Sequence, residues 1–157
     1  MNRSELFLKK RIGIIGGSRA SKESLKKAEL TGKLIAKNGY ILVNGGMGGV
    51  MEASSRGAKS ENGLVISILP GMNFNDANIY TDIAIPTGLG YMRNPVVVFN
   101  SDVIVAIDGS YGTLSEIAYS NIYDKKIFGL DTWDISGIEV FETPEEIIEE
   151  INKYFGK

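Results

Sequence analysis

One stretch decides the fold of this chain: Val103-Ile104-Val105-Ala106-Ile107-Asp108-Gly109-Ser110-Tyr111-Gly112-Thr113-Leu114-Ser115-Glu116. Its apolar run predicts a buried strand, and the apolar residues from Leu114 to Ile122 recur at the spacing of one helix face. A glycine-rich turn between a strand and a helix can bind an anion, because the first helical amides have no intrahelical partner and the helix dipole adds positive charge. We therefore expect a phosphate-bearing, nucleotide-like ligand at this turn, with Gly109, Ser110, Gly112 and Thr113 as the binding residues.

The composition sets limits on the class of protein. A chain of 157 residues, 43% hydrophobic and 23% charged, predicts a single globular domain over residues 1–157. A net charge of -2 argues against a duplex nucleic-acid partner, which would require a basic face. Since no apolar segment is long enough to span a bilayer and residues 1–11 contain no apolar signal core, we expect a cytoplasmic protein without a membrane partner.

The chain contains no histidine and no cysteine. These absences exclude a Ser-His-Asp triad, a Cys-His pair and a histidine zinc site. Any chemistry must therefore use carboxylates, Lys, Arg, Tyr, hydroxyls and backbone dipoles. We expect no metal site and no bound catalytic cofactor.

The remaining sequence alternates apolar strands with helical patterns. Strands are predicted at residues 12–15, 40–43, 64–69, 83–85, 103–107 and 127–130, and helices at about 22–38, 50–59, 95–99, 114–122 and from 144 onward. Strands that are apolar throughout and alternate with helices indicate an α/β fold, with a parallel sheet covered by helices on both faces. Ser21 is a predicted N-cap, and Thr143-Pro144-Glu145-Glu146 is a predicted capping box at the start of the last helix.

Three glycine-rich turns, at 16–18, 45–49 and 109–112, follow strands of this sheet. The carboxyl ends of parallel strands lie at one edge, so these turns should converge on a single site. The further candidate ligand-binding residues are Gly17, Ser18, Gly45, Gly46 and Gly48. No turn carries the complete dinucleotide fingerprint or a P-loop lysine, and the turn at 45–49 could instead serve only close helix packing.

The segment from Pro95 to Phe99 is ambiguous, because its β-branched residues favour a strand. The next strand begins at Val103, which leaves a connection too short for a parallel crossover. We therefore predict a short helix, with Asn94 as its cap and Pro95 in its first turn.

Two side chains have both a structural and a functional interpretation. Spacing alone favours Thr113 and Glu116 as a capping box, whereas the functional alternative is a carboxylate directed into a pocket beside the anion-binding amides. Arg93 could be an ordinary solvated arginine or a guanidinium that holds phosphate or orients Glu116. Asp102 and Trp133 are expected to be structural.

In these residues the chain resembles the Lonely Guy family, often labelled "lysine decarboxylase-like", whose hallmark is Pro-Gly-Gly-x-Gly-Thr-x-x-Glu. The likeness runs from about Arg11 to Trp133. Within the family, the chain most resembles a prokaryotic subgroup, which in turn resembles plant and algal molybdenum cofactor carrier proteins. The resemblance implies a Rossmann-like fold, usually dimeric, with a shared nucleotide site. It also implies that Arg93 and Glu116 are catalytic and that the turn from Gly109 to Thr113 holds phosphate. The reaction implied is hydrolysis of the N-glycosidic bond of a nucleoside 5′-monophosphate, and lysine decarboxylation has no support.

Three positions differ from the family's enzymes. Asp108 replaces the hallmark proline, Ser110 replaces the second glycine, and Asn94, a further candidate ligand-binding residue, replaces a basic residue. Two functions therefore stay open: a phosphoribohydrolase, and a non-catalytic carrier or sensor of a nucleotide-like cofactor such as molybdopterin. Both predict a small phosphorylated ligand and a homodimer or higher homo-oligomer.

Overall fold

The computed structural model describes residues 3–157 and contains one sheet, in which neighbouring strands run parallel. The strand order is β4-β3-β2-β1-β5-β6-β7. The strands are β1 (Arg11–Gly16), β2 (Ile41–Asn44), β3 (Val65–Leu69), β4 (Ile83–Pro86), β5 (Val103–Ile107), β6 (Lys126–Leu130) and β7 (Ile138–Val140). This arrangement confirms the predicted α/β, Rossmann-like class.

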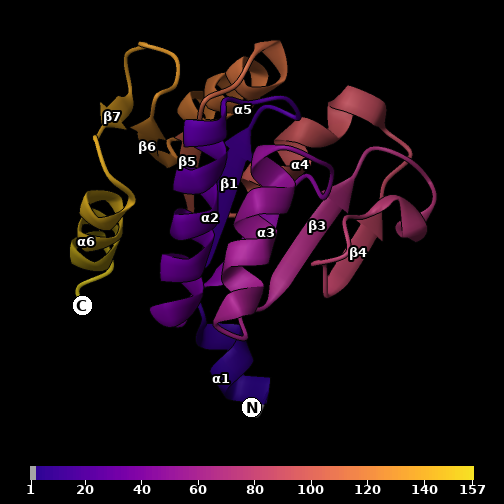
Figure 1. Ribbon diagram of the computed structural model, residues 1–157, viewed down its shortest axis with the longest axis horizontal. Helices are drawn as coiled ribbons and strands as arrows, with labels where there is room; N and C mark the ends of the chain where they lie inside the picture. Colours follow the sequence, from indigo (N-terminus) through magenta and orange to yellow (C-terminus); the bar gives the residue numbers. More distant parts are fainter. Residues whose placement is uncertain (1–2) are drawn as a thin grey trace.

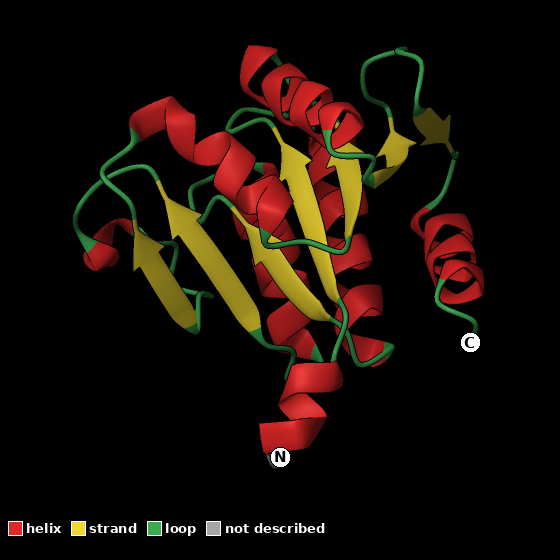
Figure 2. Ribbon diagram, turned by 180° about the vertical axis from the view of Figure 1, so that it is seen from behind, coloured by secondary structure: helices red, strands yellow, loops and turns green. Residues whose placement is uncertain are grey.

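Helices cover both faces of the sheet. They are α1 (Arg3–Leu8), α2 (Lys22–Lys37), α3 (Val50–Ser60), α4 (Asn94–Phe99), α5 (Tyr111–Ile122) and α6 (Pro144–Tyr154), with 3-10 turns η1 (Phe74–Asp76) and η2 (Gly90–Arg93). Helices α2, α3 and α6 pack on one face (Figure 1), and α4 and α5 pack on the other (Figure 2). Each face therefore has its own apolar core.

The order of the strands indicates where a ligand should bind. β5 is buried at every residue, as its apolar run predicts, and it lies beside β1 in the middle of the sheet. The chain moves outward from β1 through β2 to β4, then returns to the other side of β1 as β5. In open α/β sheets, ligands bind beyond the carboxyl ends of the strands at such a reversal.

Two details differ from the sequence prediction. The short helix α4 exists, but Asn94 is its first residue and Arg93 occupies the cap position. The strand β7 was not predicted, and Trp133 therefore lies between two strands rather than after the last one. β7 is only three residues long and its last two residues are exposed, so it lacks the apolar run by which the other strands were predicted.

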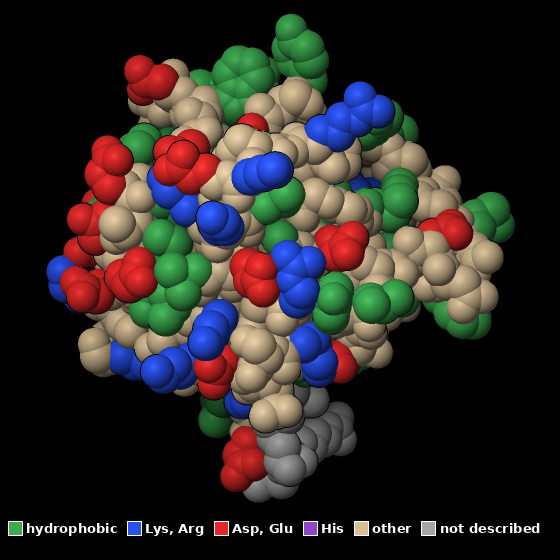
Figure 3. Space-filling view, viewed as in Figure 1, with side chains coloured by type: hydrophobic (Ala, Val, Ile, Leu, Met, Phe, Trp, Pro, Cys, Tyr) green, Lys and Arg blue, Asp and Glu red, His purple; other side chains and the backbone are tan. Residues whose placement is uncertain are grey.

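The surface over α2 and α3 carries acidic and basic side chains interspersed with one another (Figure 3). Within residues 3–157, no helix combines the length and the apolar character that a membrane span requires.

Candidate ligand-binding site

A cavity of about 740 Å³ lies beyond the carboxyl ends of the central strands. Residues of the three glycine-rich turns, of η2 and of the start of α5 line it, so the turns converge as the topology predicts. The candidate residues on its wall are Gly17, Ser18, Gly45, Arg93, Asn94, Ser110, Gly112, Thr113 and Glu116. Gly46, Gly48 and Gly109 do not line it.

The turn after β2 combines both roles considered for it. Gly45 lines the cavity, and a side chain there would collide with the guanidinium of Arg93. Gly46 instead donates its amide to the side chain of Asn44 at 2.9 Å. Gly49 has a φ of 65° and lies against the backbone of the turn after β1, where a Cβ would not fit. Part of this turn therefore serves helix packing and part of it borders the cavity.

The start of α5 has no side-chain cap. Ser110 is the N-cap residue, its side chain makes no capping bond, and the first helical bond runs from Leu114 N to Ser110 O at 2.9 Å. The amides of Tyr111, Gly112 and Thr113 therefore have no intrahelical acceptor. All three residues line the cavity, which places the positive end of the helix dipole on its wall.

The capping box predicted for Thr113 and Glu116 is wrong. Because α5 begins at Tyr111, Thr113 is the third residue of the helix rather than its cap. Glu116 is then one turn inside the helix, and its side chain lines the cavity.

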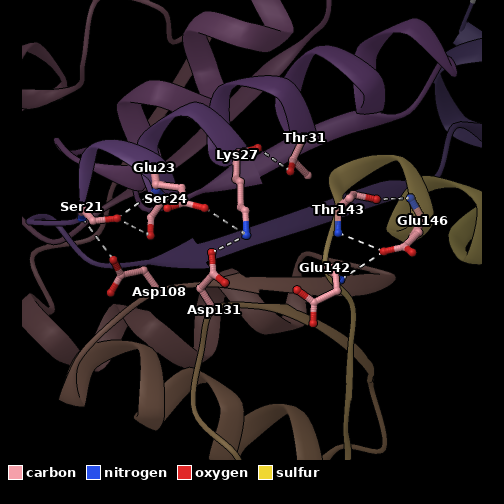
Figure 4. Close-up of polar contacts among 10 residues, drawn as sticks. All are labelled: Ser21, Glu23, Ser24, Lys27, Thr31, Asp108, Asp131, Glu142, Thr143 and Glu146. Carbon is pink, nitrogen blue, oxygen red and sulfur yellow. Dashed lines mark hydrogen bonds and ion pairs between the residues drawn. The ribbon is translucent and has the colours of Figure 1, made fainter.

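Asp108 occupies part of the turn with its own carboxylate. Its Oδ1 accepts the amide of Gly109 at 2.6 Å, and its Oδ2 accepts the amide of Ser21 at 3.3 Å, so the side chain points to the start of α2 (Figure 4). The residue adopts a φ of 53°, an uncommon value outside glycine. The Gly109 amide is therefore already used within the chain, and an anion in the cavity would meet the amides of α5 instead.

Arg93 is buried rather than solvated, with 8% of its surface exposed. Its guanidinium donates from Nε to Ile68 O at 2.9 Å, from Nη2 to Gly45 O at 3.3 Å, and from Nη1 to the side chain of Asn94. Burial lowers the pKa of Arg93, and the nearby charge of Glu116 opposes that shift. Arg93 thus links η2 to β3 and to the turn after β2, and it adds positive charge at the cavity wall.

Glu116 is 6% exposed. Among the described residues, its carboxyl group makes neither a hydrogen bond nor an ion pair within 4.0 Å. Its oxygens therefore keep access to the cavity, because no fully enclosed side-chain oxygen among these residues lacks a partner. Burial raises the pKa of Glu116 to about 8, and the charge of Arg93 reduces that rise. The cavity wall therefore contains a carboxyl group that holds its proton at neutral pH.

Two aromatic side chains on the cavity wall were missed in the sequence. Tyr91 is 86% exposed and Tyr111 is 80% exposed, although both line the cavity. The ring of Tyr111 lies 6.2 Å from that of Trp133, whose Nε1 donates to Ser110 O at 3.3 Å. The sequence did contain a signal for them, because each tyrosine stands beside glycines in a predicted turn, where a large ring is not needed for the core.

No cluster of metal-binding side chains is present in the part of the chain that the structure describes. An incoming ligand would therefore meet backbone amides, one buried carboxyl group, a buried guanidinium and two tyrosine rings.

Comparison with known proteins agrees with the resemblance read from the sequence. The model of the SLOG cluster4 family matches residues 9–154. An uncharacterized protein of Archaeoglobus fulgidus is 45% identical over 138 residues, which are 87% of this chain and 91% of that protein. The chain therefore belongs to the SLOG cluster4 family, a Lonely Guy-like group.

Solved structures show the same fold. The molybdenum cofactor binding protein of Rippkaea orientalis superposes with a TM-score of 0.89 at 38% identity, over 94% of this chain and 98% of that one. The molybdenum cofactor carrier protein of Chlamydomonas reinhardtii gives a TM-score of 0.87 at 30% identity, over 95% and 99%. DNA processing protein A of Helicobacter pylori is 20% identical with a TM-score of 0.77, and this likeness concerns the fold alone.

Proposed function

We propose that this member of the SLOG cluster4 family binds a phosphate-bearing, nucleotide-like compound in the cavity and carries it without converting it. Molybdopterin, in free form or within the molybdenum cofactor, is the compound that we favour. The observation that carries the proposal is the uncapped start of α5, which presents the amides of Tyr111, Gly112 and Thr113 to the cavity.

The cavity suits such a ligand. Its volume of about 740 Å³ lies within the range of roughly 300–1,000 Å³ that small-molecule sites occupy. Tyr91 and Tyr111 offer ring faces on which a planar heterocycle can stack. The α5 amides would hold the phosphate of such a ligand, and the two tyrosine rings would hold its ring system.

The relatives support carriage more than hydrolysis. Two structures that each align over at least 94% of this chain are named for binding or carrying the molybdenum cofactor. The departures from the hydrolase hallmark at Asp108 and Ser110 fit the same interpretation, since Asp108 uses the Gly109 amide that a ligand phosphate would otherwise accept.

Hydrolysis of a nucleoside 5′-monophosphate is the second candidate. Glu116 lines the cavity and interacts electrostatically with Arg93, the pair expected to be catalytic. However, a neutral carboxyl group neither activates water as a base nor stabilises a developing cation. The guanidinium of Arg93 also donates to Ile68 O, Gly45 O and the Asn94 side chain. Both observations favour binding over turnover.

We also propose that a second copy of the chain covers the outer face of α4 and α5. Exposed apolar side chains gather there: Phe99, Tyr119, Ile122 and Tyr123. The rings of Phe99 and Tyr123 meet edge-on at 4.7 Å, which joins the end of α4 to the end of α5 on this surface. Half-exposed side chains of this size leave on the order of 400 Å² of apolar surface, as much as the largest patch on a typical monomer. These four side chains carry no charge, so the patch can face its own copy across a two-fold axis.

Light scattering coupled to gel filtration tests the second copy. We expect a dimer or a multiple of it for the native chain and a monomer for Ile122→Glu, which places a charge on the patch. Lys26→Glu, on an exposed part of α2, is the matched control and should leave the mass unchanged. A monomeric native chain would contradict this part of the proposal.

Native mass spectrometry of the protein as purified tests the binding proposal. We expect an added mass equal to that of a phosphate-bearing heterocycle, and no free base when a panel of nucleoside 5′-monophosphates is incubated with the protein. Release of base that Glu116→Gln abolishes would favour the hydrolase instead. Absence of binding to every phosphorylated compound tested would contradict both functions.

A further inference from the structure

The start of α5 places a carboxyl group beside the amides proposed to bind the anion. Glu116 follows Gly112 by four residues and Thr113 by three, so the three residues share one face of the helix. Helical side chains tilt toward the N-terminus of their helix, which directs the Glu116 carboxyl group toward those amides. All three residues line the same cavity.

The Glu116 residue is 6% exposed, and its carboxyl group makes no hydrogen bond to another described residue. Since no fully enclosed side-chain oxygen among the described residues lacks a partner, the carboxyl oxygens retain access to the cavity. The charged group that faces it is Arg93, from η2, which does not approach within ion-pair distance. Tyr91 and Tyr111 are the other titratable side chains on the cavity wall, while Asp108 points away toward Ser21.

The elements packed against α5 place no other charged side chain near the cavity. α4 and β5 contain no titratable residue, and the charged residues of β1 and β6, Arg11 and Lys126, stand at their amino ends, away from the cavity. A carboxylate at Glu116 would therefore lie next to a bound anion with only Arg93 to offset the repulsion.

We propose that Glu116 enters the complex as a neutral carboxylic acid and donates a hydrogen bond from its O–H to an oxygen of the bound anion, so that binding requires one proton on Glu116. This inference rests on the proposed anion site at the start of α5. It specifies the ligand further, because the group beside Glu116 must be an acceptor such as a phosphate or carbonyl oxygen.

The electrostatics of the site agree with this assignment. Burial raises the pKa of Glu116 to about 8, so the acid form predominates at neutral pH. Affinity is then present below pH 8 and is lost as the pH rises through that value, because the free protein must first take up a proton.

Calorimetric titration with adenosine 5′-monophosphate tests the inference. The phosphate of this probe is already a dianion above pH 7, since a phosphate monoester has a second pKa of about 6. We expect the Kd of the native chain to rise about tenfold between pH 7 and pH 9. Glu116→Gln keeps an N–H donor but no proton to lose. The Kd of this variant should not change with pH. It should be a few-fold higher than that of the native chain at pH 7 and lower than that of the native chain at pH 9.

Glu149→Gln on α6 is the matched control, because Glu149 is exposed and far from the cavity; it should reproduce the native pH dependence. A native Kd that does not change with pH overturns this inference and leaves the proposed function standing. A Glu116→Gln protein that is folded but shows no binding at pH 7 also overturns it, since the neutral donor would then be insufficient.

A second measurement does not depend on the ligand. In a carbon-13 titration of labelled glutamate side chains, the resonance that disappears in Glu116→Gln should have its midpoint near pH 8. A midpoint near the ordinary value of about 4.3 overturns the inference whether or not the probe binds. Failure of the probe to bind at any pH contradicts the proposed anion site itself.

Discussion

A threonine followed three residues later by a glutamate lies near the start of both α5 and α6, yet the pKa of the glutamate is raised in α5 and lowered in α6. Thr143 and Glu146 form a capping box at α6: Thr143 Oγ1 accepts the amide of Glu146 at 3.3 Å, and Glu146 Oε2 accepts that of Thr143 at 3.0 Å (Figure 4). These bonds to backbone amides lower the pKa of Glu146, which lies at the surface. At α5, Thr113 and Glu116 have the same spacing, yet Glu116 is buried and its pKa is raised to about 8.

The position of the first helical residue explains the difference. Pro144 begins α6 directly after Thr143, because proline suits the first turn and Thr143 is extended. At α5 the helix begins at Tyr111, two residues before Thr113, so the pattern lies inside the helix. A threonine and a glutamate three residues apart therefore form a capping box only where the threonine directly precedes the helix. Inside a helix, as at α5, they can instead line a cavity.

Arg93 makes the largest difference between the two helix starts, because its charge acts on Glu116 whereas backbone amides act on Glu146. Arg93→Met should lower the free energy of unfolding by about 4 kcal/mol, since it leaves buried carbonyl oxygens without their donor. Loss of the positive charge should also move the titration midpoint of Glu116 upward. Urea denaturation measures the first effect and carbon-13 NMR the second.

The control for this change is Arg56→Met, which removes a half-exposed ion pair with Glu29 and should cost less than about 1 kcal/mol. Equal losses for the two variants would contradict a supporting role for Arg93.

Glu116→Gln and Glu146→Gln should change stability in opposite directions. The pKa of Glu116 is raised on folding, so its contribution to the free energy of unfolding is complete below about pH 4 and is lost as the pH rises to about 8. Glu116→Gln should therefore match the native chain at pH 4 and exceed its free energy of unfolding by on the order of 5 kcal/mol at pH 9.

The pKa of Glu146 is lowered on folding, so its contribution is present at neutral pH and is lost as the pH falls through the folded value. Glu146→Gln should accordingly be less stable than the native chain at pH 7, and the difference should shrink in acid. Urea denaturation across this pH range measures both variants. The same sign of change for both at pH 7 to 9 would contradict the assignment.

Ser110→Asp would give α5 the cap that α6 already has. A carboxylate at the N-cap accepts the amides that we propose for the ligand, so binding of adenosine 5′-monophosphate should weaken about thirtyfold, or ~2 kcal/mol. Thr143→Asp is the matched control, because it exchanges one capping side chain for another at α6 and should leave the Kd unchanged. Unaltered affinity in Ser110→Asp would place the anion elsewhere.

The sequence predicted the fold well because local and global signals agree. The buried run from Val103 to Ile107 and the alternation around it indicate a parallel sheet, and the turns after β1, β2 and β5 meet at one edge. The box at Thr143 was predictable because Pro144 fixes where α6 begins.

The remaining features depend on contacts between distant residues. The buried guanidinium of Arg93 donates to Ile68 O and Gly45 O, which are 25 and 48 residues away along the chain. The first residue of α5 follows from a turn in which Asp108 accepts the amides of Gly109 and Ser21, the latter 87 residues distant. Spacing within a single segment carries no information on either arrangement.

Amide NMR of the nitrogen-15-labelled protein during titration with adenosine 5′-monophosphate tests the anion site at α5 most directly. We predict large shifts for the amides of Tyr111, Gly112 and Thr113, and none for those of Glu145 and Glu146 at the capped start of α6. If the α5 amides do not move while the ligand binds, or if both helix starts respond alike, the uncapped start of α5 is not the binding site.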